Sequence, residues 1–241
     1  MNGVISVVVP VFNHSHTLCA CVASILRQQI NLPNNPLEII IVNDGSTDNF
    51  SQVSKEILKN DLAKSKVVKI INQENKGAPA ARNNGFKVAK GEFVIFVDAD
   101  TICYPYMFKE MIAKLNRYPE VSYCYSQFLF GFKKIKSQEF NADDVKKNNY
   151  IDTTTLIRAR DFPGFDENLK RFQDWDLWLT MFEKGKAGIF VPMVLYKKIV
   201  RGRAGISNWL PSFIYKLPWK SKKVKDYEAA KEIVLKKHHL I

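Results

Sequence analysis

The first hundred residues alternate between short β-branched runs and segments with helix signals, and this alternation constrains the fold most. The β-branched runs lie at residues 4–9, 37–42, 67–71 and 93–97. The helical segments lie between them, at residues 17–29, 44–59 and 77–90. Because strands that are joined by helices pair in parallel, we predict an α/β chain with a mostly parallel central sheet that is flanked by helices.

The pattern changes in the second half of the chain. Two aromatic, strand-like segments at 121–130 and 150–157 flank a lysine-rich stretch at 133–149, which has few apolar residues and is predicted to be a loop or a mobile insertion. A helix near 174–184 and a strand near 189–196 follow. No repeat and no low-complexity linker divides the chain, so we predict one domain with a C-terminal extension.

The charge of the chain is unevenly placed. The 241 residues contain 36 Lys or Arg and 24 Asp or Glu, a net charge of +12, and 46% are hydrophobic. This balance excludes a disordered tail, a collagen-like fibre and a small disulfide scaffold. Residues 197–241 hold 12 of the basic and only 3 of the acidic residues, so the body is nearly balanced and the extension is basic. A uniformly basic nucleic-acid binder does not have this distribution.

The cysteines and the N-terminal residues bear on the compartment. The four cysteines show no C-x-x-C spacing and are accompanied by only four histidines, which favours free thiols in a reducing compartment over a zinc site. No charge precedes Arg27, but Pro10 and a polar turn at 13–16 interrupt the apolar run. Neither a signal peptide nor a spanning helix is therefore predicted, and we expect a cytoplasmic protein.

Polar residues follow three of the predicted strands, at the point where each strand ends. They are Pro10–Asn13, Asp44–Asp48 and Asp98–Asp100. Because ligands of parallel α/β sheets bind at the carboxyl ends of the strands, we expect these segments to converge on one site. The turn at 44–48 can also cap the next helix, but capping leaves Asp44 to accept hydrogen bonds from a base or a ribose.

Asp98 and Asp100 follow a buried strand and form a D-x-D motif. Residues two apart in an extended chain point the same way, so both carboxylates can face one ion. Two neighbouring carboxylates are costly unless a positive charge neutralises them, and Mg²⁺ or Mn²⁺ bound by carboxylates and substrate phosphates fits best. The alternative is a solvated turn, because a lone D-x-D is a weak motif.

These segments together resemble the family 2 glycosyltransferases, inverting enzymes of the GT-A (Rossmann-like) fold that use nucleotide-diphospho-sugars. The matching residues, in chain order, are Val7–Asn13, Ile40–Asp48, Asn75–Asn83, Phe96–Asp100, Phe162–Asp166 and Gln173–Trp178. The resemblance spans roughly residues 3–207. It implies a domain at 1–207, with a donor half at 1–100 and an acceptor half at 101–207, followed by a basic extension at 208–241.

The resemblance also implies a donor site for a nucleotide-diphospho-sugar, with a UDP-sugar expected. The residues around the nucleotide would be Pro10, Phe12, Asp44 and Arg82. Asp98 would bind the ribose or a Mn²⁺ or Mg²⁺ ion, and Asp100 would be the main metal ligand beside the diphosphate. The metal and nearby cations would stabilise the charge that develops on the leaving UDP. The alternative for Arg82 is a solvated arginine on the surface of a helix.

Asp174 matches the catalytic base of the family. By this resemblance it deprotonates a hydroxyl of a glycan or lipid-linked acceptor as that oxygen attacks the anomeric carbon from the face opposite the nucleotide, which inverts the configuration. The alternative for Asp174 is a helix N-cap, and Asp176 is a second candidate for the base.

Two positions depart from the family pattern. Gln173 stands where the family usually has Glu beside the base. The family also often has a histidine metal ligand after the last strand, but no histidine lies between 197 and 207. Arg201 and Arg203 lie there instead, and we predict that one of them contacts the diphosphate as a fixed cation.

The C-terminal extension interleaves aromatic residues with lysines. The segment 209–223 has the composition of a contact with an anionic membrane surface, and 226–240 has the pattern of an amphipathic helix. Such a contact would place the protein peripherally at the cytoplasmic membrane face. The alternative is a solvated tail whose aromatic side chains pack back on the domain. No recognised nucleic-acid module is present, and the sequence leaves the oligomeric state open.

Three other functions fit the sequence less well. A non-catalytic module that binds a nucleotide sugar or glycan can share this fold, but Asp98, Asp100 and Asp174 are all present. A nucleotidyltransferase needs a glycine-rich, basic loop after the first strand, and Pro10–His14 is not one. A dinucleotide oxidoreductase needs a G-x-G-x-x-G motif there, which is missing.

Overall fold

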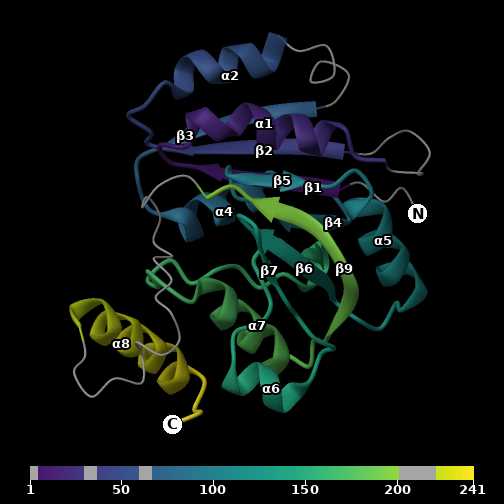
Figure 1. Ribbon diagram of the computed structural model, residues 1–241, viewed down its shortest axis with the longest axis vertical. Helices are drawn as coiled ribbons and strands as arrows, with labels where there is room; N and C mark the ends of the chain where they lie inside the picture. Colours follow the sequence, from purple (N-terminus) through teal and green to yellow (C-terminus); the bar gives the residue numbers. More distant parts are fainter. Residues whose placement is uncertain (1–4, 30–36, 60–66, 201–220) are drawn as a thin grey trace.

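The computed structural model of the chain describes residues 5–29, 37–59, 67–200 and 221–241 (Figure 1). Its strands are β1 (Ile5–Val11), β2 (Leu37–Asp44), β3 (Val67–Gln73), β4 (Phe93–Phe96), β5 (Thr101–Cys103), β6 (Tyr123–Phe130), β7 (Lys133–Ile135), β8 (Leu156–Arg158) and β9 (Gly188–Lys198). Its helices are α1 (Ser15–Leu26), α2 (Phe50–Lys59), α4 (Ala78–Lys87), α5 (Met107–Arg117), α6 (Ala142–Lys147), the short 3-10 helix η1 (Ala159–Asp161), α7 (Gln173–Glu183) and α8 (Lys222–Lys237).

One sheet connects the strands in the order β3-β2-β1-β4-β8-β6-β9-β5, with β7 beside β6. The first four strands pair in parallel, and Val8 of β1 lies opposite both Ile40 of β2 and Phe96 of β4. In the second half the pairs β4–β8, β6–β8 and β5–β9 are antiparallel, whereas β6–β9 is parallel. The predicted α/β fold with a central sheet flanked by helices is confirmed, and the sheet is mixed in its second half.

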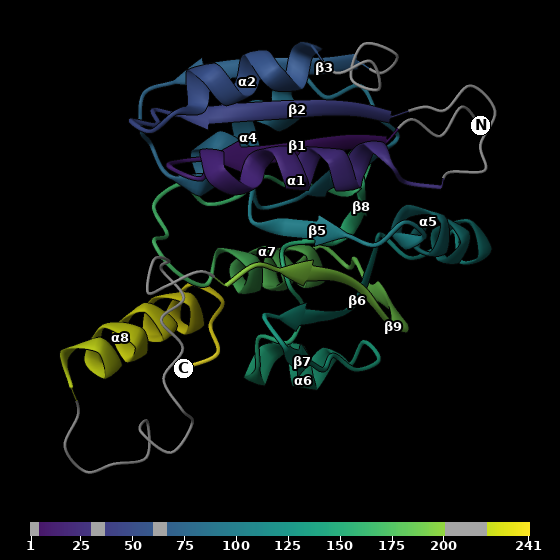
Figure 2. The same cartoon turned by 45° about the horizontal axis from the view of Figure 1, so that its top comes forward.

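Alternation along the strands gives the sheet two apolar faces. Val7 and Val9 of β1 belong to a core that also contains Leu18 of α1 and apolar residues of α2 and α5. Val8 faces the other way and packs in a second core with residues of α4 and α7, including Trp178. Figure 2 shows these helices on the two sides of the sheet. Burial on both faces explains why the strands are continuous apolar runs rather than alternating ones.

The loops at the carboxyl ends of β1 and β2 are tied together. Asn13 adopts a positive φ of 56°, and its side-chain oxygen accepts a hydrogen bond of 2.8 Å from the Thr47 backbone N–H. The Asn13 backbone N–H donates to Ser46 Oγ at 3.1 Å. The polar segments at 10–13 and 44–48, which the sequence predicts to converge, are therefore neighbours in the structure.

The lysine-rich stretch at 133–149 is more ordered than the sequence predicts. It contains β7, which pairs with β6, and the helix α6. Asn141 caps α6 by accepting hydrogen bonds from two N–H groups of its first turn, and Val145 is buried. The indole N–H of Trp175 donates to the Val145 carbonyl at 2.6 Å. The prediction of a loop was wrong because α6 is too short to show an apolar period in the sequence. Its capping residue and one buried side chain are enough to stabilise it.

The C-terminal helix α8 packs against α7, as Figures 1 and 2 both show. Val234 of α8 is fully buried in a small core with Trp175 and Leu179 of α7. None of the described helices is long and apolar enough to cross a membrane. The predicted diphosphate contacts Arg201 and Arg203, and the segment 209–220, lie outside the described residues.

Candidate active site

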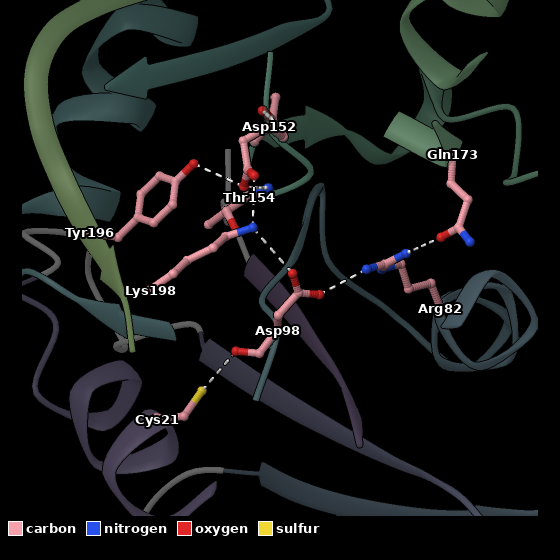
Figure 3. Close-up of polar contacts among 9 residues, drawn as sticks. Cys21, Arg82, Asp98, Asp152, Thr154, Gln173, Tyr196 and Lys198 are labelled. Atoms are coloured by element: carbon pink, nitrogen blue, oxygen red, sulfur yellow. Dashed lines mark hydrogen bonds and ion pairs between the residues drawn. The ribbon is translucent and has the colours of Figure 1, made fainter. Parts of the chain in front are cut away.

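Asp98 follows β4 and is held by two cations. Arg82 Nη2 donates to Asp98 Oδ1 at 2.8 Å, and Lys198 Nζ donates to Asp98 Oδ2 at 3.3 Å (Figure 3). Arg82 comes from α4 and Lys198 from the end of β9, so segments that are distant in the sequence meet at this carboxylate. Burial alone would raise the pKa of Asp98, but Lys198 and Arg82 hold it well below the usual range of a carboxyl group. Asp98 is therefore ionised.

Asp100 differs from Asp98 in having a free ligand atom. Its Oδ1 is buried and has no hydrogen-bond partner among the described residues. Burial and the negative charge of Asp98 raise the pKa of Asp100. A carboxylate oxygen without a donor fits a hard divalent ion such as Mn²⁺ or Mg²⁺. The described residues hold no cluster of three or more His, Cys, Asp or Glu suited to an ion, so such an ion needs further ligands from phosphates or water.

Lys198 also binds Asp152, which the sequence analysis did not select. Lys198 Nζ lies 2.7 Å from Asp152 Oδ2. The other oxygen of Asp152 accepts hydrogen bonds of 2.9 Å from the Tyr196 hydroxyl and from the Thr154 backbone N–H, and Figure 3 shows Tyr196 and Lys198 reaching it from one strand. Burial alone would lower the pKa of Lys198, but Asp152 and Asp98 raise it, so the ammonium group keeps its charge.

The sequence carries only a weak signal for these two residues. Lys198 is the second residue after the last predicted strand, at 189–196. Asp152 lies inside the segment 150–157, where the polar run Asp-Thr-Thr-Thr interrupts the apolar pattern and the structure has no strand before Leu156. That interruption was the available sign that the segment leaves the sheet and contributes to a site.

Gln173 connects the D-x-D motif to the helix of the candidate base. Its Oε1 accepts a hydrogen bond of 3.0 Å from Arg82 Nη1, and the same guanidinium binds Asp98 (Figure 3). Only 6% of the Arg82 side chain is exposed, so Arg82 is not the solvated surface arginine of the alternative interpretation. The amide of Gln173 thus supplies a neutral acceptor where a second carboxylate would add negative charge beside Asp174.

Asp174 lies in the first turn of α7 and is not its N-cap. The helix begins at Gln173, and the capping position is Phe172, with a left-handed φ of 58°. Burial raises the pKa of Asp174, and the nearby Asp152 carboxylate adds to this effect, against a hydrogen bond from Asn149. A carboxylate with a raised pKa is a stronger proton acceptor, which suits a general base.

Asp176, the second candidate for the base, is engaged by α8. Its Oδ1 lies 2.7 Å from Lys237 Nζ and 2.9 Å from His238 Nε2, and its side chain is 3% exposed. Asp176 therefore serves the packing of α8 on α7.

Of the residues expected around the nucleotide, Arg82 lies on α4 and the other three lie at the carboxyl ends of β1 and β2. Pro10 is buried within β1, and Phe12 is 45% exposed. Asp44 is buried and accepts three hydrogen bonds of 2.7, 2.8 and 2.9 Å, from the Gln73 side chain and from two backbone N–H groups before α4. Asp44 thus fixes the start of the helix that carries Arg82, and Phe12 offers an open aromatic ring.

Residues 6–167 match the sequence model of the family described as Glycosyl transferase family 2. The match covers more than half of the chain and includes both aspartates of the D-x-D motif. The chain belongs to this family. The predicted resemblance is confirmed.

Curated relatives of this glycosyltransferase family member match it over part of its length. The uncharacterized glycosyltransferase YibD of Escherichia coli K12 is 36% identical over 127 residues, which cover 52% of this chain and 35% of YibD. The glycosyltransferase GlyG of Streptococcus pneumoniae is 43% identical over 103 residues, which cover 42% of this chain and 32% of GlyG. The chain spans about a third of the length of these relatives.

Solved structures share the fold of this family 2 member. S. aureus TarS in complex with UDP-GlcNAc has a TM-score of 0.71 at 20% identity, over 88% of this chain and 64% of that one. The mannosyltransferase PcManGT from Pyrobaculum calidifontis, in complex with GDP-Man and Mn²⁺, has a TM-score of 0.66 at 18% identity, over 83% of this chain and 57% of that one. The expected GT-A fold is therefore confirmed.

Proposed function

We propose that this family 2 member transfers a sugar from a UDP-sugar to a hydroxyl group of a glycan or lipid-linked acceptor, with inversion at the anomeric carbon. The double contact of Arg82 carries the proposal. Its guanidinium binds Asp98 of the D-x-D motif and also Gln173, the residue before Asp174. One buried cation thus links a carboxylate of the D-x-D motif to the residue that precedes the candidate base. The complexes of TarS with UDP and with UDP-GlcNAc support a uridine nucleotide donor.

In the proposed donor site, the nucleotide lies against the carboxyl ends of β1, β2 and β4. The residues assigned to it are Pro10, Phe12, Asp44, Arg82 and Asp98, with Arg203 as a diphosphate contact. Asp100 is the main ligand of a Mn²⁺ or Mg²⁺ ion, because its buried Oδ1 lacks a partner among the described residues. When bound, the ion stabilises negative charge on the leaving diphosphate. The complex of PcManGT with GDP-Man and Mn²⁺ supports this assignment.

Asp174 is the general base of the proposed reaction. Its carboxylate takes the proton of the acceptor hydroxyl while that oxygen forms a bond to the anomeric carbon. On the opposite face, the bond between the anomeric carbon and the diphosphate oxygen breaks, and UDP leaves with the bonding electrons. One displacement of this kind inverts the configuration. The raised pKa of Asp174 supports this role.

The proposal also divides the chain by role. Residues 1–100 form the donor half and residues 101–207 the acceptor half, and the groups around Asp98 come from both. Residues 208–241 form an extension whose segment 209–223 contacts an anionic membrane surface at the cytoplasmic face. The lysines and aromatic residues of that segment support the contact.

A donor screen tests the proposed function. The full chain with Mn²⁺ and each nucleotide sugar is assayed for released nucleotide, and UDP affinity is measured by calorimetry. We expect one UDP-sugar to be turned over. Asp174→Asn should lower kcat by about 10²–10⁴-fold and leave UDP affinity unchanged, because only proton transfer is removed.

Asp143→Asn, on the exposed face of α6, is the matched control and should retain full activity. UDP binding without any turnover would favour the binding-module alternative, and absence of both would contradict the proposal.

A further inference from the structure

The ammonium group of Lys198 lies between two carboxylates of the candidate active site (Figure 3). It lies 2.7 Å from Asp152 and 3.3 Å from Asp98, and only 13% of the Lys198 side chain is exposed. A lysine that is covered to this extent is strongly destabilising unless carboxylates compensate its charge. The charge of Lys198 is therefore a fixed part of the site.

Asp152 anchors the ammonium group from the side away from Asp98. Its second oxygen is taken by the hydroxyl of Tyr196, which is fully buried, and by the backbone N–H of Thr154. These two hydrogen bonds fix the carboxylate of Asp152. Lys198 is consequently held in place and extends from Asp152 toward Asp98.

The two aspartates of the D-x-D motif are therefore unequal. Arg82 binds one oxygen of Asp98 and Lys198 binds the other. Asp100 keeps a buried oxygen without a partner among the described residues. A divalent ion that enters this site can bind the free oxygen of Asp100, whereas both oxygens of Asp98 are already bound by cations.

We propose that Lys198 is a built-in cation of the donor site, which competes with the divalent ion for Asp98 and donates a hydrogen bond to the donor diphosphate. The inference rests on the proposed function, because it requires a nucleotide-diphospho-sugar donor. An ammonium group has three N–H donors, and the two carboxylates use two of them. The third makes no hydrogen bond to a described residue, with the centroid of the Phe128 ring 5.5 Å from Nζ, and is available to a phosphate oxygen. The positive charge also reduces the repulsion between Asp98 and the diphosphate.

The two parts of this role predict that loss of the Lys198 charge changes the affinities for Mn²⁺ and for UDP in opposite directions. Lys198→Met removes the charge and frees one oxygen of Asp98, so the affinity for Mn²⁺ alone rises by about tenfold, as expected for one charge interaction in a partly buried site. The affinity for UDP at saturating Mn²⁺ falls by about tenfold, because a charged hydrogen bond is lost. A lysine that only supported the fold would lower both affinities.

The test uses the full chain and two binding measurements. Mn²⁺ binding without nucleotide is followed by the electron paramagnetic resonance signal of the free ion, and UDP binding is followed by calorimetry. Lys198→Arg keeps the charge and should keep both affinities near those of the original chain. Lys197→Met is the matched control, because Lys197 is the neighbouring residue on β9 and its ammonium lies over the ring of Phe132. It should change neither affinity.

The outcomes separate this inference from the proposed function. If Lys198→Met leaves Mn²⁺ affinity unchanged or lower, leaves UDP affinity unchanged, or behaves like Lys197→Met, the inference is overturned. If its melting curve shows that this variant does not fold, Asp152→Asn replaces it. Lys198 then pairs with Asp98 alone, so Mn²⁺ should bind more weakly, and stronger or unchanged binding overturns the inference. If the original chain binds no UDP at all, it is the proposed function that fails.

Discussion

At the scale of single residues, the position of Arg82 depends on a glycine one turn later in α4. A Cβ atom built on Gly85 overlaps the side chain of Val8 in β1 and lies 3.1 Å from Val42 in β2. Only glycine allows the helix to approach the two strands this closely. The buried guanidinium of Arg82 reaches Asp98 from a helix held at this depth.

Gly85→Ala should therefore affect both stability and donor binding. The added methyl group overpacks the core and should lower the free energy of unfolding by about 1–3 kcal/mol, measured by urea denaturation. The shift of α4 should also weaken UDP binding through Arg82, measured by calorimetry. Gly185→Ala is the control: Gly185 has a φ of 70°, and no atom of the described residues lies within 4 Å of the added Cβ. It should cost about 1–2 kcal/mol from the backbone alone and leave UDP affinity unchanged. Unchanged UDP affinity in Gly85→Ala would show that donor binding does not depend on the close approach of α4 to β1 and β2.

At the scale of elements, β9 shows why part of the site could not be predicted. Asp98, Asp100 and Asp174 lie where local patterns place them, after an apolar strand and at the start of an amphipathic helix. Lys198 is different, because β9 and β6 pair with register shifts on both sides of Gln127. A shift of one residue turns a side chain to the other face of the sheet, and no local pattern encodes it.

The contact between α7 and α8, like the position of Lys198, depends on tertiary structure and is not encoded in a local sequence pattern. Lys237 Nζ lies 2.7 Å from both Asp166 and Asp176, and His238 binds Asp176 through one ring nitrogen and Glu183 through the other. The sequence predicts an amphipathic helix at 226–240, and the structure has α8 at Lys222–Lys237. The surface that α8 covers could not be predicted, because its partners are acidic residues from two distant segments.

The protonation of His238 should make this contact depend on pH. Burial alone would lower the pKa of His238, but its hydrogen bonds to Asp176 and Glu183 raise it above the ordinary value. Lys237 faces the same oxygen of Asp176 and adds a second positive charge beside the carboxylates of Asp166, Asp176 and Glu183. Because the folded-state pKa is the higher one, the stabilisation is fully present below about pH 6.5 and is lost as pH rises through the folded-state pKa.

His238→Asn should accordingly reduce the pH dependence of the melting temperature. Between about pH 5.5 and pH 8.5, the original chain should lose more thermal stability than the variant, since the charged hydrogen bonds of His238 contribute only when the ring is protonated. At the lower pH the variant should be less stable by about 1–3 kcal/mol.

His239→Asn is the control, because His239 is exposed and has a φ of 52°, which asparagine tolerates. A pH dependence that is equal in the two variants would exclude the proposed role of His238.

At the scale of the whole molecule, the first half of the fold follows from sequence pattern more completely than the second. Strands β1, β2 and β4 are mainly apolar and buried on both faces, whereas β3 lies at the edge of the sheet, is half-buried and contains Lys69. Each of the four is predicted to within a few residues. The later sheet contains strands of three residues, β5, β7 and β8, which are too short to give a period. Tertiary pairing decides these strands, so the second half of the chain was predicted less well than the first.

The charge distribution of the whole chain gives a last prediction. Residues 1–196 are nearly balanced, and the segment 209–223 combines aromatic residues with lysines, so membrane contact should depend on this segment. Replacing Lys220, Lys222 and Lys223 by Gln should weaken binding to vesicles of phosphatidylglycerol by about 100-fold, since each lysine contributes about 1 kcal/mol near an anionic surface. Vesicles of phosphatidylcholine should bind weakly in all cases, and added salt should reduce the difference in binding between the original chain and the variant.

The control variant replaces Lys55, Lys59 and Lys109 by Gln. These lysines are exposed elsewhere on the chain, and their replacement removes the same net charge. Equal losses in the two triple variants, measured by vesicle sedimentation, would assign the binding to overall charge rather than to the extension.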